Sequence, residues 1–341
     1  MNNKLSLLLL FSLWGCSSLP QASNNHDNTG MTLKKSPQHT SILMKAQWSH
    51  GAKDCTHHQQ PTLDIYQHNA NTFIMRQNKC LTYEAPFIYV LIGQDKILII
   101  DTGDIEKHAD ISMYTQIKSA IGLTHQDKKW LVIHSHSHGD HVAGDHFFSA
   151  KKNVTLVGTK AQDIQNFFGF NDWPNDIVQL KLGQRTLSII PTPGHQEEAI
   201  TVYDPDTQWL LTGDSLYPGK IYIKDWQSYK KSILKLTDFS EQYPVKAILG
   251  AHIEMKNKAG QYYPIGTQYQ PNESPLDLPL SDLHALNAVL NQHLHEKQGN
   301  DIKEHNESNN EITPLIFERF IIVPMNFFQR MMSNMARLFN S

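Results

Sequence analysis

The sequence VIHSHSHGDHVAG, residues 132–144, decides how the rest of the chain is interpreted. It places four histidines and an aspartate within eight positions, directly after an apolar stretch. Histidines crowded at the end of a strand repel one another when charged and gain little from burial when neutral. Packing alone therefore does not explain this cluster, whereas a bound cation does.

The composition of the whole chain is that of a globular protein. Its 341 residues can bury a substantial core, and 30 Lys and Arg residues nearly balance 33 Asp and Glu residues. The sequence contains no basic block suited to a phosphate backbone, so we expect no nucleic-acid partner. It also contains no Gly-rich phosphate loop or nucleophile elbow. The chemistry is therefore expected from the 19 histidines and the carboxylates near them.

Residues 1–16 resemble a bacterial lipoprotein signal peptide: a lysine, an apolar stretch and a small residue precede Cys16. This segment is too short to span a bilayer permanently. The resemblance implies a lipid anchor on Cys16, and Ser17 favours the outer membrane, facing the periplasm; ordinary secretion is the alternative. Residues 17–45 are polar with little apolar periodicity, which predicts a flexible tether.

Two further cysteines, Cys55 and Cys80, follow this segment. Export would place both in an oxidising compartment, where pairing is the default. Two separate buried thiols are the alternative, because the sequence does not show their geometry.

Strands alternate with helices in residues 46–296, which we interpret as one layered α/β domain. The patterns predict strands at 71–77, 86–93, 96–103, 130–133, 154–158, 185–190, 208–212 and 245–250, and helices at 111–122, 141–150, 226–240 and 280–296. A polar linker, residues 297–310, precedes a tail, residues 311–341, whose apolar residues from Phe327 to Phe339 fall at helical spacing. This amphipathic helix would dock on its own domain, lie on the membrane or self-associate.

Four of the predicted strands are followed by residues that commonly bind metals. These are His136, His138, Asp140 and His141 after 130–133, His195 after 185–190, Asp214 after 208–212, and His252 after 245–250. The carboxyl ends of strands in an α/β sheet open onto one edge, so these side chains could converge there. They exceed what one tetrahedral ion needs, which predicts two ions. Nitrogen and oxygen donors suit zinc, with iron or manganese not excluded.

At these residues the chain resembles a known family. SHSHGDH, residues 135–141, is similar to the HxHxDH signature of the metallo-β-lactamase superfamily, and Asp101 (IIDTG), His195 (TPGH), Asp214 (TGD) and His252 (GAH) match its other motifs in order. The resemblance covers about residues 48–275 and implies an αββα sandwich of two sheets faced by helices. It implies that His136, His138 and His195 hold the first ion, that Asp140, His141 and His252 hold the second, and that Asp214 bridges them. Asp101 would be a supporting acid rather than a ligand.

The resemblance also implies hydrolysis of a small-molecule substrate by a hydroxide that bridges two zinc ions, with Asp140 orienting it. Drug-hydrolysing members mostly have cysteine or serine at the place of Asp214. An ester, thioester or lactone is therefore expected rather than a β-lactam, in an exported lipoprotein-type branch. The alternatives are a β-lactam hydrolase on the same site, an oxidoreductase similar to mononuclear iron persulfide dioxygenases, and a non-enzymatic zinc-binding lipoprotein.

Some residues near the motifs have two interpretations. Three residues are candidates for protonating the leaving group, namely Tyr217, Tyr222 and His134. His134 is more simply a structural histidine at a strand end. Tyr217, Tyr222, Trp226, Tyr262 and Tyr263 could line a substrate cleft or pack in the core.

Overall fold

The computed structural model describes residues 39–57, 61–104, 112–122, 125, 127–295 and 314–325, and the side chains of residues 292–295 are not described. The predicted signal peptide, residues 1–16, the linker, residues 297–310, and the tail helix, residues 327–339, lie outside the described residues. None of the helices in the described part of the chain has both the length and the apolar composition that crossing a bilayer requires.

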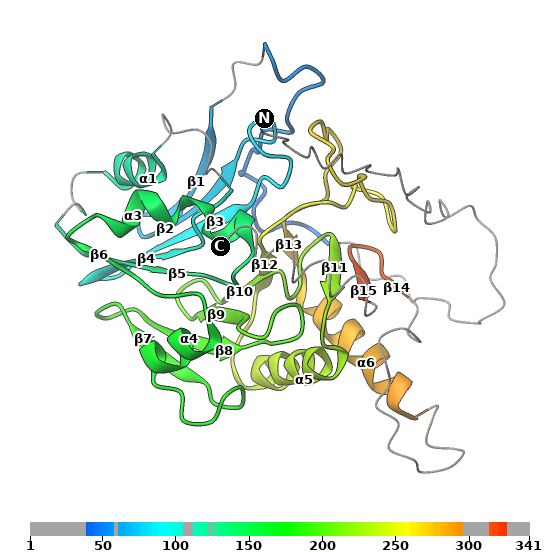
Figure 1. Ribbon diagram of the computed structural model, residues 1–341. Coiled ribbons are helices and arrows are strands. Elements are labelled where there is room, and N and C mark those ends of the chain that lie inside the picture. Colours follow the sequence, from blue (N-terminus) through cyan, green and yellow to red (C-terminus); the bar gives the residue numbers. More distant parts are fainter. Residues whose placement is uncertain are drawn as a thin grey trace, which may run out of the picture. The chain divides into compact units, whose positions relative to one another are not determined.

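The first of two large sheets, sheet A, has six strands in the order β1-β2-β3-β4-β5-β6 (Figure 1). They are β1 (Leu63–Asn69), β2 (Thr72–Gln77), β3 (Phe87–Ile92), β4 (Lys96–Ile100), β5 (Lys129–Ile133) and β6 (Val154–Leu156). Neighbours from β1 to β4 are antiparallel, and β4, β5 and β6 are parallel. Side chains alternate between the faces: in β3, Tyr89 belongs to the core between the sheets and Val90 to the core under the helices.

The second, sheet B, has the order β13-β12-β10-β9-β8-β7. Its strands are β7 (Val178–Lys181), β8 (Thr186–Pro191), β9 (Ile200–Asp204), β10 (Trp209–Gly213), β12 (Ala247–Gly250) and β13 (Asp277–Leu278). β9 is antiparallel to both β8 and β10, and β12 is parallel to β10. Because β8, β10 and β12 therefore run in one direction, their carboxyl ends lie at one edge of sheet B.

Helices cover the outer face of each sheet, which confirms the αββα architecture (Figure 1). α1 (Met113–Ile121) and α3 (His146–Ser149) share a core with sheet A, and α5 (Trp226–Gln242) and α6 (Leu280–His295) share one with sheet B. A third core of apolar residues fills the space between the sheets. α4 (Ala161–Phe168) lies between β6 and β7 in the chain.

The continuous helix predicted at 141–150 is wrong. The chain instead forms three short turns, α2 (Gly139–Val142), a 3₁₀ turn (Ala143–Asp145) and α3. The backbone N–H of Thr102 donates to the carbonyl of His141 at 2.8 Å, so this carbonyl is taken by a partner from another segment. A neighbouring loop therefore interrupts the helical ladder at His141, next to the histidine cluster.

The tether was predicted to extend to residue 45, but residues 39–45 belong to the folded domain. Leu43 is buried in the core between the sheets. The carboxylate of Asp277 accepts hydrogen bonds from the Ile42 backbone N–H and from His39, each at 2.9 Å. A buried carboxylate needs such partners, and in the described part of the chain residues 39–42 supply them.

Part of the predicted tail also belongs to the domain. Residues 314–325 contain β14 (Leu315–Ile316) and β15 (Ile321–Pro324), and β15 pairs in parallel with β11 (Lys220–Ile223) to form a third, three-stranded sheet. The sequence patterns predicted none of these strands, nor β1, β7, β9, β13 or α4.

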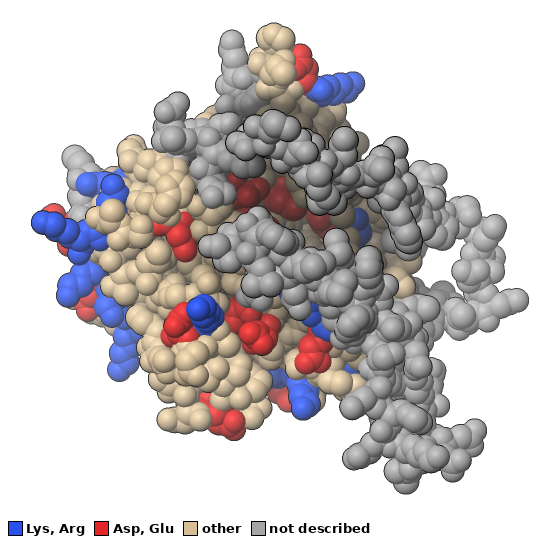
Figure 2. Space-filling model, viewed as in Figure 1, with Lys and Arg blue, Asp and Glu red and all other residues tan. Residues whose placement is uncertain are grey.

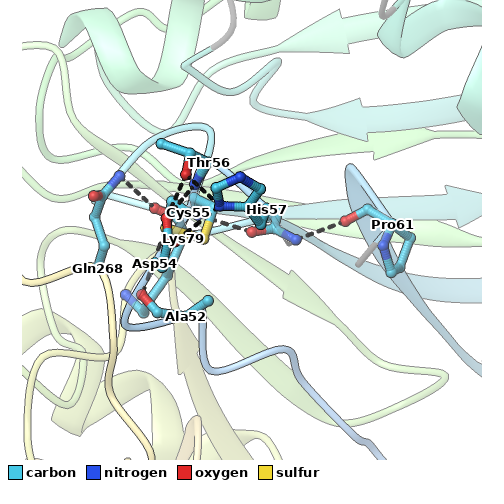
Figure 3. Close-up of a disulfide and its surroundings, with 10 residues drawn as sticks. Ala52, Asp54, Cys55, Thr56, His57, Pro61, Lys79 and Gln268 are labelled. Carbon is cyan, nitrogen blue, oxygen red and sulfur yellow. Dashed lines mark hydrogen bonds and ion pairs between the residues drawn. A yellow bond between two sulfur atoms is a disulfide. The ribbon is translucent and has the colours of Figure 1, made fainter. Parts of the chain in front are cut away.

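A disulfide joins Cys55 to Cys80, as expected from the two cysteines (Figure 3). Their Cα atoms lie 5.1 Å apart. Lys79, next to Cys80, is buried, and its backbone carbonyl accepts a hydrogen bond from the Gln268 side chain at 3.3 Å. The disulfide therefore lies where the first described residues, β2 and the loop before β13 meet.

Candidate metal centre

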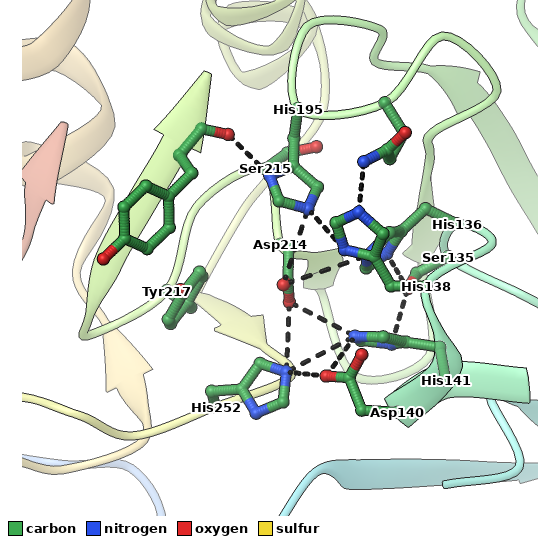
Figure 4. Close-up of polar contacts among 12 residues, drawn as sticks. Ser135, His136, His138, Asp140, His141, His195, Asp214, Ser215, Tyr217 and His252 are labelled. Atoms are coloured by element: carbon green, nitrogen blue, oxygen red, sulfur yellow. Dashed lines mark hydrogen bonds and ion pairs between the residues drawn. The ribbon is translucent and has the colours of Figure 1, made fainter. Parts of the chain in front are cut away.

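The structure brings together all seven residues that the sequence singled out (Figure 4). His136, His138, Asp140 and His141 follow β5 of sheet A, whereas His195, Asp214 and His252 follow β8, β10 and β12 of sheet B. The sequence patterns predicted a site at the edge of a single sheet. The site instead lies where the ends of both sheets meet.

Gly213, at the end of β10, allows this approach. Its φ of +51° is in the left-handed region, and a Cβ atom built there would lie 2.4 Å from the Cβ of Ser135. Any larger residue would push the histidine loop after β5 away from the carboxyl end of β10. Glycine at this position therefore lets donors from the two sheets share one site.

The donors form two groups. Within a group, each residue offers one donor atom, and these atoms all lie within 4.8 Å of one another. The first group consists of His136, His138, His195 and Asp214. The second consists of Asp140, His141 and His252. In the first, His195 Nε2 lies 3.2 Å from His138 Nδ1. In the second, His252 Nε2 lies 3.1 Å from Asp140 Oδ2 and 3.3 Å from His141 Nε2.

Asp214 faces both groups. Its Oδ2 lies 3.7 Å from His195 Nε2 and 3.9 Å from His136 Nε2. Its Oδ1 lies 3.4 Å from His252 Nε2 and 3.6 Å from His141 Nε2. One carboxylate oxygen therefore points to each group, which is the geometry of a bridging ligand.

Three of the histidines are oriented through the ring nitrogen that faces away from the cluster. Nδ1 of His141 lies 2.9 Å from Asp101 Oδ2, Nδ1 of His195 lies 2.6 Å from the Tyr222 carbonyl, and Nδ1 of His252 lies 3.1 Å from the Glu84 carbonyl. Because each partner is an acceptor, Nδ1 carries a proton, which leaves Nε2 as the nitrogen that would offer a lone pair to a cation in the site. Asp101 thus supports the site without joining it, as predicted.

The sequence did not predict the two carbonyl partners. A backbone carbonyl at Glu84 or Tyr222 has no residue-type signature, so only the fold identifies it as a partner. The side chain of Gln196, next to His195, is a further missed partner and contacts His138 Nε2. Because His138 uses Nε2 in this way, it presents Nδ1 to the cluster.

Two buried atoms in the cluster lack a hydrogen-bond partner among the described residues. They are Nε2 of His136 and Oδ1 of Asp214. Leaving such atoms buried and unpaired costs free energy, and buried polar groups are nearly always satisfied. His136 Nε2 faces the first group and Asp214 Oδ1 faces the second, so a cation in each group would satisfy one of these atoms. The residues present therefore fit divalent metal ions.

The electrostatic environment differs between the groups. Burial lowers the pKa of His195 to about 4 and holds the pKa values of His136 and His138 well below their usual range. Burial also opposes the charged form of His252, but the carboxylates of Asp214 and Asp140 raise its pKa to about 9. Without metal, the imidazoles of the first group are therefore neutral at pH 7, whereas His252 in the second is protonated.

Further carboxylates lie near the second group. Burial raises the pKa values of Asp104 and Glu254, and the negative charge of Glu84 adds to both shifts. Figure 2 shows acidic residues grouped near the middle of one face of the molecule. The surroundings of the donors are thus rich in negative charge, which favours cations.

The residues considered for protonating the leaving group differ in burial and in hydrogen bonding. His134 is 3 % exposed and its Nε2 lies 2.8 Å from Asp145 Oδ1, which agrees with a structural histidine. Tyr217 is buried, and its hydroxyl donates to the Lys220 carbonyl at 2.7 Å. Tyr222 is partly exposed. Among the other aromatic candidates for a cleft, Trp226 and Tyr263 are buried and Tyr262 is partly exposed.

The comparisons with known proteins agree with this geometry. The family model of the metallo-beta-lactamase superfamily matches residues 82–252, half of the chain, a range that contains all seven clustered residues. A hydroxyacylglutathione hydrolase of Brucella anthropi is 31% identical over 86 residues, which cover 25% of this chain and 33% of that protein. The beta-lactamase-like protein 2 homolog of Caenorhabditis elegans is 26% identical over 165 residues, 47% of this chain and 54% of that protein.

The matches thus span about a third of the first relative and about half of the second. Among solved structures, a metallo-beta-lactamase from Pontibacter korlensis aligns with 67% of this chain and 99% of its own, at 17% identity and a TM-score of 0.45. On the family model and the αββα architecture, the chain belongs to the metallo-beta-lactamase superfamily.

Proposed function

We propose that this protein is a hydrolase that uses two divalent metal ions, with zinc as the preferred metal, to cleave an ester, thioester or lactone bond of a small substrate. The observation that carries the proposal is the position of Asp214, which directs one oxygen to each donor group. A structural zinc site needs four ligands and no bridging carboxylate.

The residues have separate tasks in this proposal. His136, His138 and His195 would hold one ion, and Asp140, His141 and His252 the other, with Asp214 shared. When bound, two divalent ions would lower the pKa of a bound water toward about 7 and would polarise the carbonyl under attack. Asp140 directs Oδ2 toward His141 and His252, so its other oxygen would hold the proton of the attacking water.

Two observations support the substrate class. Position 214 is aspartate, whereas the resemblance places cysteine or serine there in most drug-hydrolysing members. The curated relatives also include hydroxyacylglutathione hydrolases, whose name describes a thioester substrate. A β-lactam or a persulfide would use the same donors, so activity on either is an outcome that would replace this substrate assignment.

The test combines metal analysis with a substrate panel. Purified protein supplied with zinc should bind two ions per chain and hydrolyse a member of a panel of thioesters, lactones, β-lactams and phosphodiesters. Asp140→Asn should reduce turnover by about 100-fold or more, since a positioned proton acceptor contributes 10²–10⁴. Asp145→Asn, which changes a carboxylate outside the cluster that faces His134 and accepts the Thr102 hydroxyl, is the control and should retain activity. Fewer than one ion per chain, or full turnover in Asp140→Asn, would refute the proposal.

We also propose that the protein is anchored in the bacterial cell envelope through a lipid on Cys16. The signal-like residues 1–16 motivate this proposal, and the Cys55–Cys80 disulfide supports an oxidising compartment. Metabolic labelling with a fatty acid should label the wild type and not Cys16→Ala, and the variant should leave the membrane fraction. Equal labelling of both proteins would contradict the anchor.

A further inference from the structure

The C-terminal hairpin, residues 314–325, lies outside the residues that the family model matches, yet it pairs with a strand beside the metal centre. We infer that this hairpin is a positioning element for His195 and so sets the metal affinity of the first donor group. The inference rests on the metal-binding part of the proposed function. It follows from the two edges of β11.

One edge of β11 is held by β15. The N–H of Ile321 donates to the carbonyl of Gly219 at 2.9 Å, and the N–H of Met325 donates to the carbonyl of Ile223 at 2.8 Å. Between these residues the strands pair in register, with Tyr222 opposite Val323. Within the described part of the chain, β15 is the strand that pairs with β11.

The intervening carbonyls of β11 serve the other edge, because successive carbonyls of a strand alternate in direction. The carbonyl of Lys220 accepts the Tyr217 hydroxyl at 2.7 Å, and the carbonyl of Tyr222 accepts Nδ1–H of His195 at 2.6 Å. β11 therefore joins the hairpin to the metal centre, with β15 on one edge and a metal-binding histidine on the other.

The turn that carries His195 is hydrogen-bonded to the residues that directly follow β11. The N–H groups of Lys224 and Asp225 both donate to the carbonyl of Gly194 at 2.9 Å. Gly194 has φ +143°, and a Cβ there would lie 2.6 Å from Tyr229 Cα, so this turn is packed tightly against α5. The position of His195 thus depends on where residues 222–225 lie.

The hairpin itself is firmly attached to sheet B and its helices. Arg319 makes two hydrogen bonds of 2.6 Å with the carboxylate of Asp282 in α6. Phe317 and Phe320 stack with ring centroids 4.4 Å apart, and Ile322 is fully buried in the core under α5 and α6. These contacts fix the hairpin to α6 and to the core, so that the hairpin restrains the position of β11.

The second donor group has different supports. Asp101 orients His141 and the Glu84 carbonyl orients His252, and neither belongs to β11. The start of β11 is held separately, because the Lys220 N–H donates to Glu254 Oε2 at 2.6 Å. Loosening β15 should therefore free mainly the end of β11 and affect the first group selectively.

The test variant is Met325→Pro, which removes the N–H that holds the Ile223 carbonyl, with Met325→Leu as the matched control. Zinc titrations of the full chain should give two dissociation constants. We expect Met325→Pro to weaken one of them by about 10- to 100-fold, the usual effect of losing a partner behind a metal-binding histidine, and to leave the other unchanged. Met325→Leu should match the wild type. Arg319→Ala, which releases the hairpin from α6, should weaken the same site.

Equal weakening of both sites, or a lower unfolding free energy with both affinities intact, would overturn the inference, because the hairpin would then be only a stabilising element. A second readout needs neither metal nor substrate. In the metal-free protein, the NMR signal of the His195 Nδ1–H should broaden or shift in Met325→Pro and not in Met325→Leu. If the wild type bound no zinc, the proposed function would fail, while this signal would still decide the role of the hairpin.

Discussion

Asp101→Asn tests whether the support of His141 matters to the second donor group. Asp101 is 1 % exposed, and its φ of 67° is a conformation that asparagine also tolerates, so the backbone should not change. Its Oδ1 accepts the Ser135 N–H at 2.7 Å, and its Oδ2 accepts the Ser135 hydroxyl and His141 Nδ1–H, each at 2.9 Å.

The structure indicates the size of the effect. Asparagine can keep its oxygen toward the Ser135 N–H only by turning its NH₂ group toward His141. Two donors would then face each other, so His141 would have to move its proton from Nδ1 to Nε2, the atom that it presents to the metal. We expect the zinc affinity of the second group to fall by about 10- to 100-fold, or about 1.4 to 2.7 kcal/mol.

Zinc titration in competition with a chromogenic chelator measures this loss. Asp145→Asn is the matched control, because Asp145 supports His134 in the same way, at 2.8 Å, and His134 lies outside the cluster. The control should keep both zinc affinities within about twofold. Unchanged affinities in Asp101→Asn, or an equal loss in Asp145→Asn, would refute the reasoning.

Three further outcomes are expected. In the metal-free protein the pKa of His252 is raised to about 9, so its contribution of about 3 kcal/mol to stability is complete below pH 6.5 and is lost as the pH rises toward 9. Urea unfolding with a chelator present should show this fall. The fall should be smaller in His252→Gln but not absent, because carboxylates also raise the pKa of His141. Replacing both Cys55 and Cys80 by serine opens a loop with a sequence separation of 25 and should lower the unfolding free energy by about 3.5 kcal/mol, and an unchanged urea midpoint would contradict this. Removing zinc should lower the free energy of unfolding by about 2.7 kcal/mol for each site that was filled at a zinc concentration of 100 times its Kd. Adding a chelator should therefore lower the Tm, and an unchanged Tm would count against zinc binding.

The donors were predictable from the sequence because each follows an apolar strand. A strand of consecutive buried residues, such as Val132 and Ile133, is recognisable from its composition, and a polar residue directly after it must lie at a sheet edge. Seven such residues exceed the needs of one tetrahedral ion and so predicted two ions, whereas the division of the donors into two groups was implied by the family resemblance. The pairing of Cys55 with Cys80 was predictable for a different reason, the oxidising compartment implied by the signal-like segment.

Other features depend on contacts between distant segments. The helix predicted at 141–150 is broken because Thr102 takes the His141 carbonyl, and Thr102 is about 40 residues away in the chain. The apolar stretch at 320–324 is compatible with a strand, but its partner, β11, lies about 100 residues earlier. β9 is different: Ile200, Thr201 and Val202 are β-branched, so local propensity could have identified it.

The largest difference from the sequence analysis is that the site belongs to two sheets rather than to one sheet edge. The first group takes His136 and His138 from the loop after sheet A and His195 from sheet B, while the second takes Asp140 and His141 from sheet A and His252 from sheet B. Each proposed ion would therefore connect the two sheets at the point where Gly213 lets them approach. Metal binding and the packing of the sheets are then one linked equilibrium, because the donors of either ion come together only when the sandwich has formed.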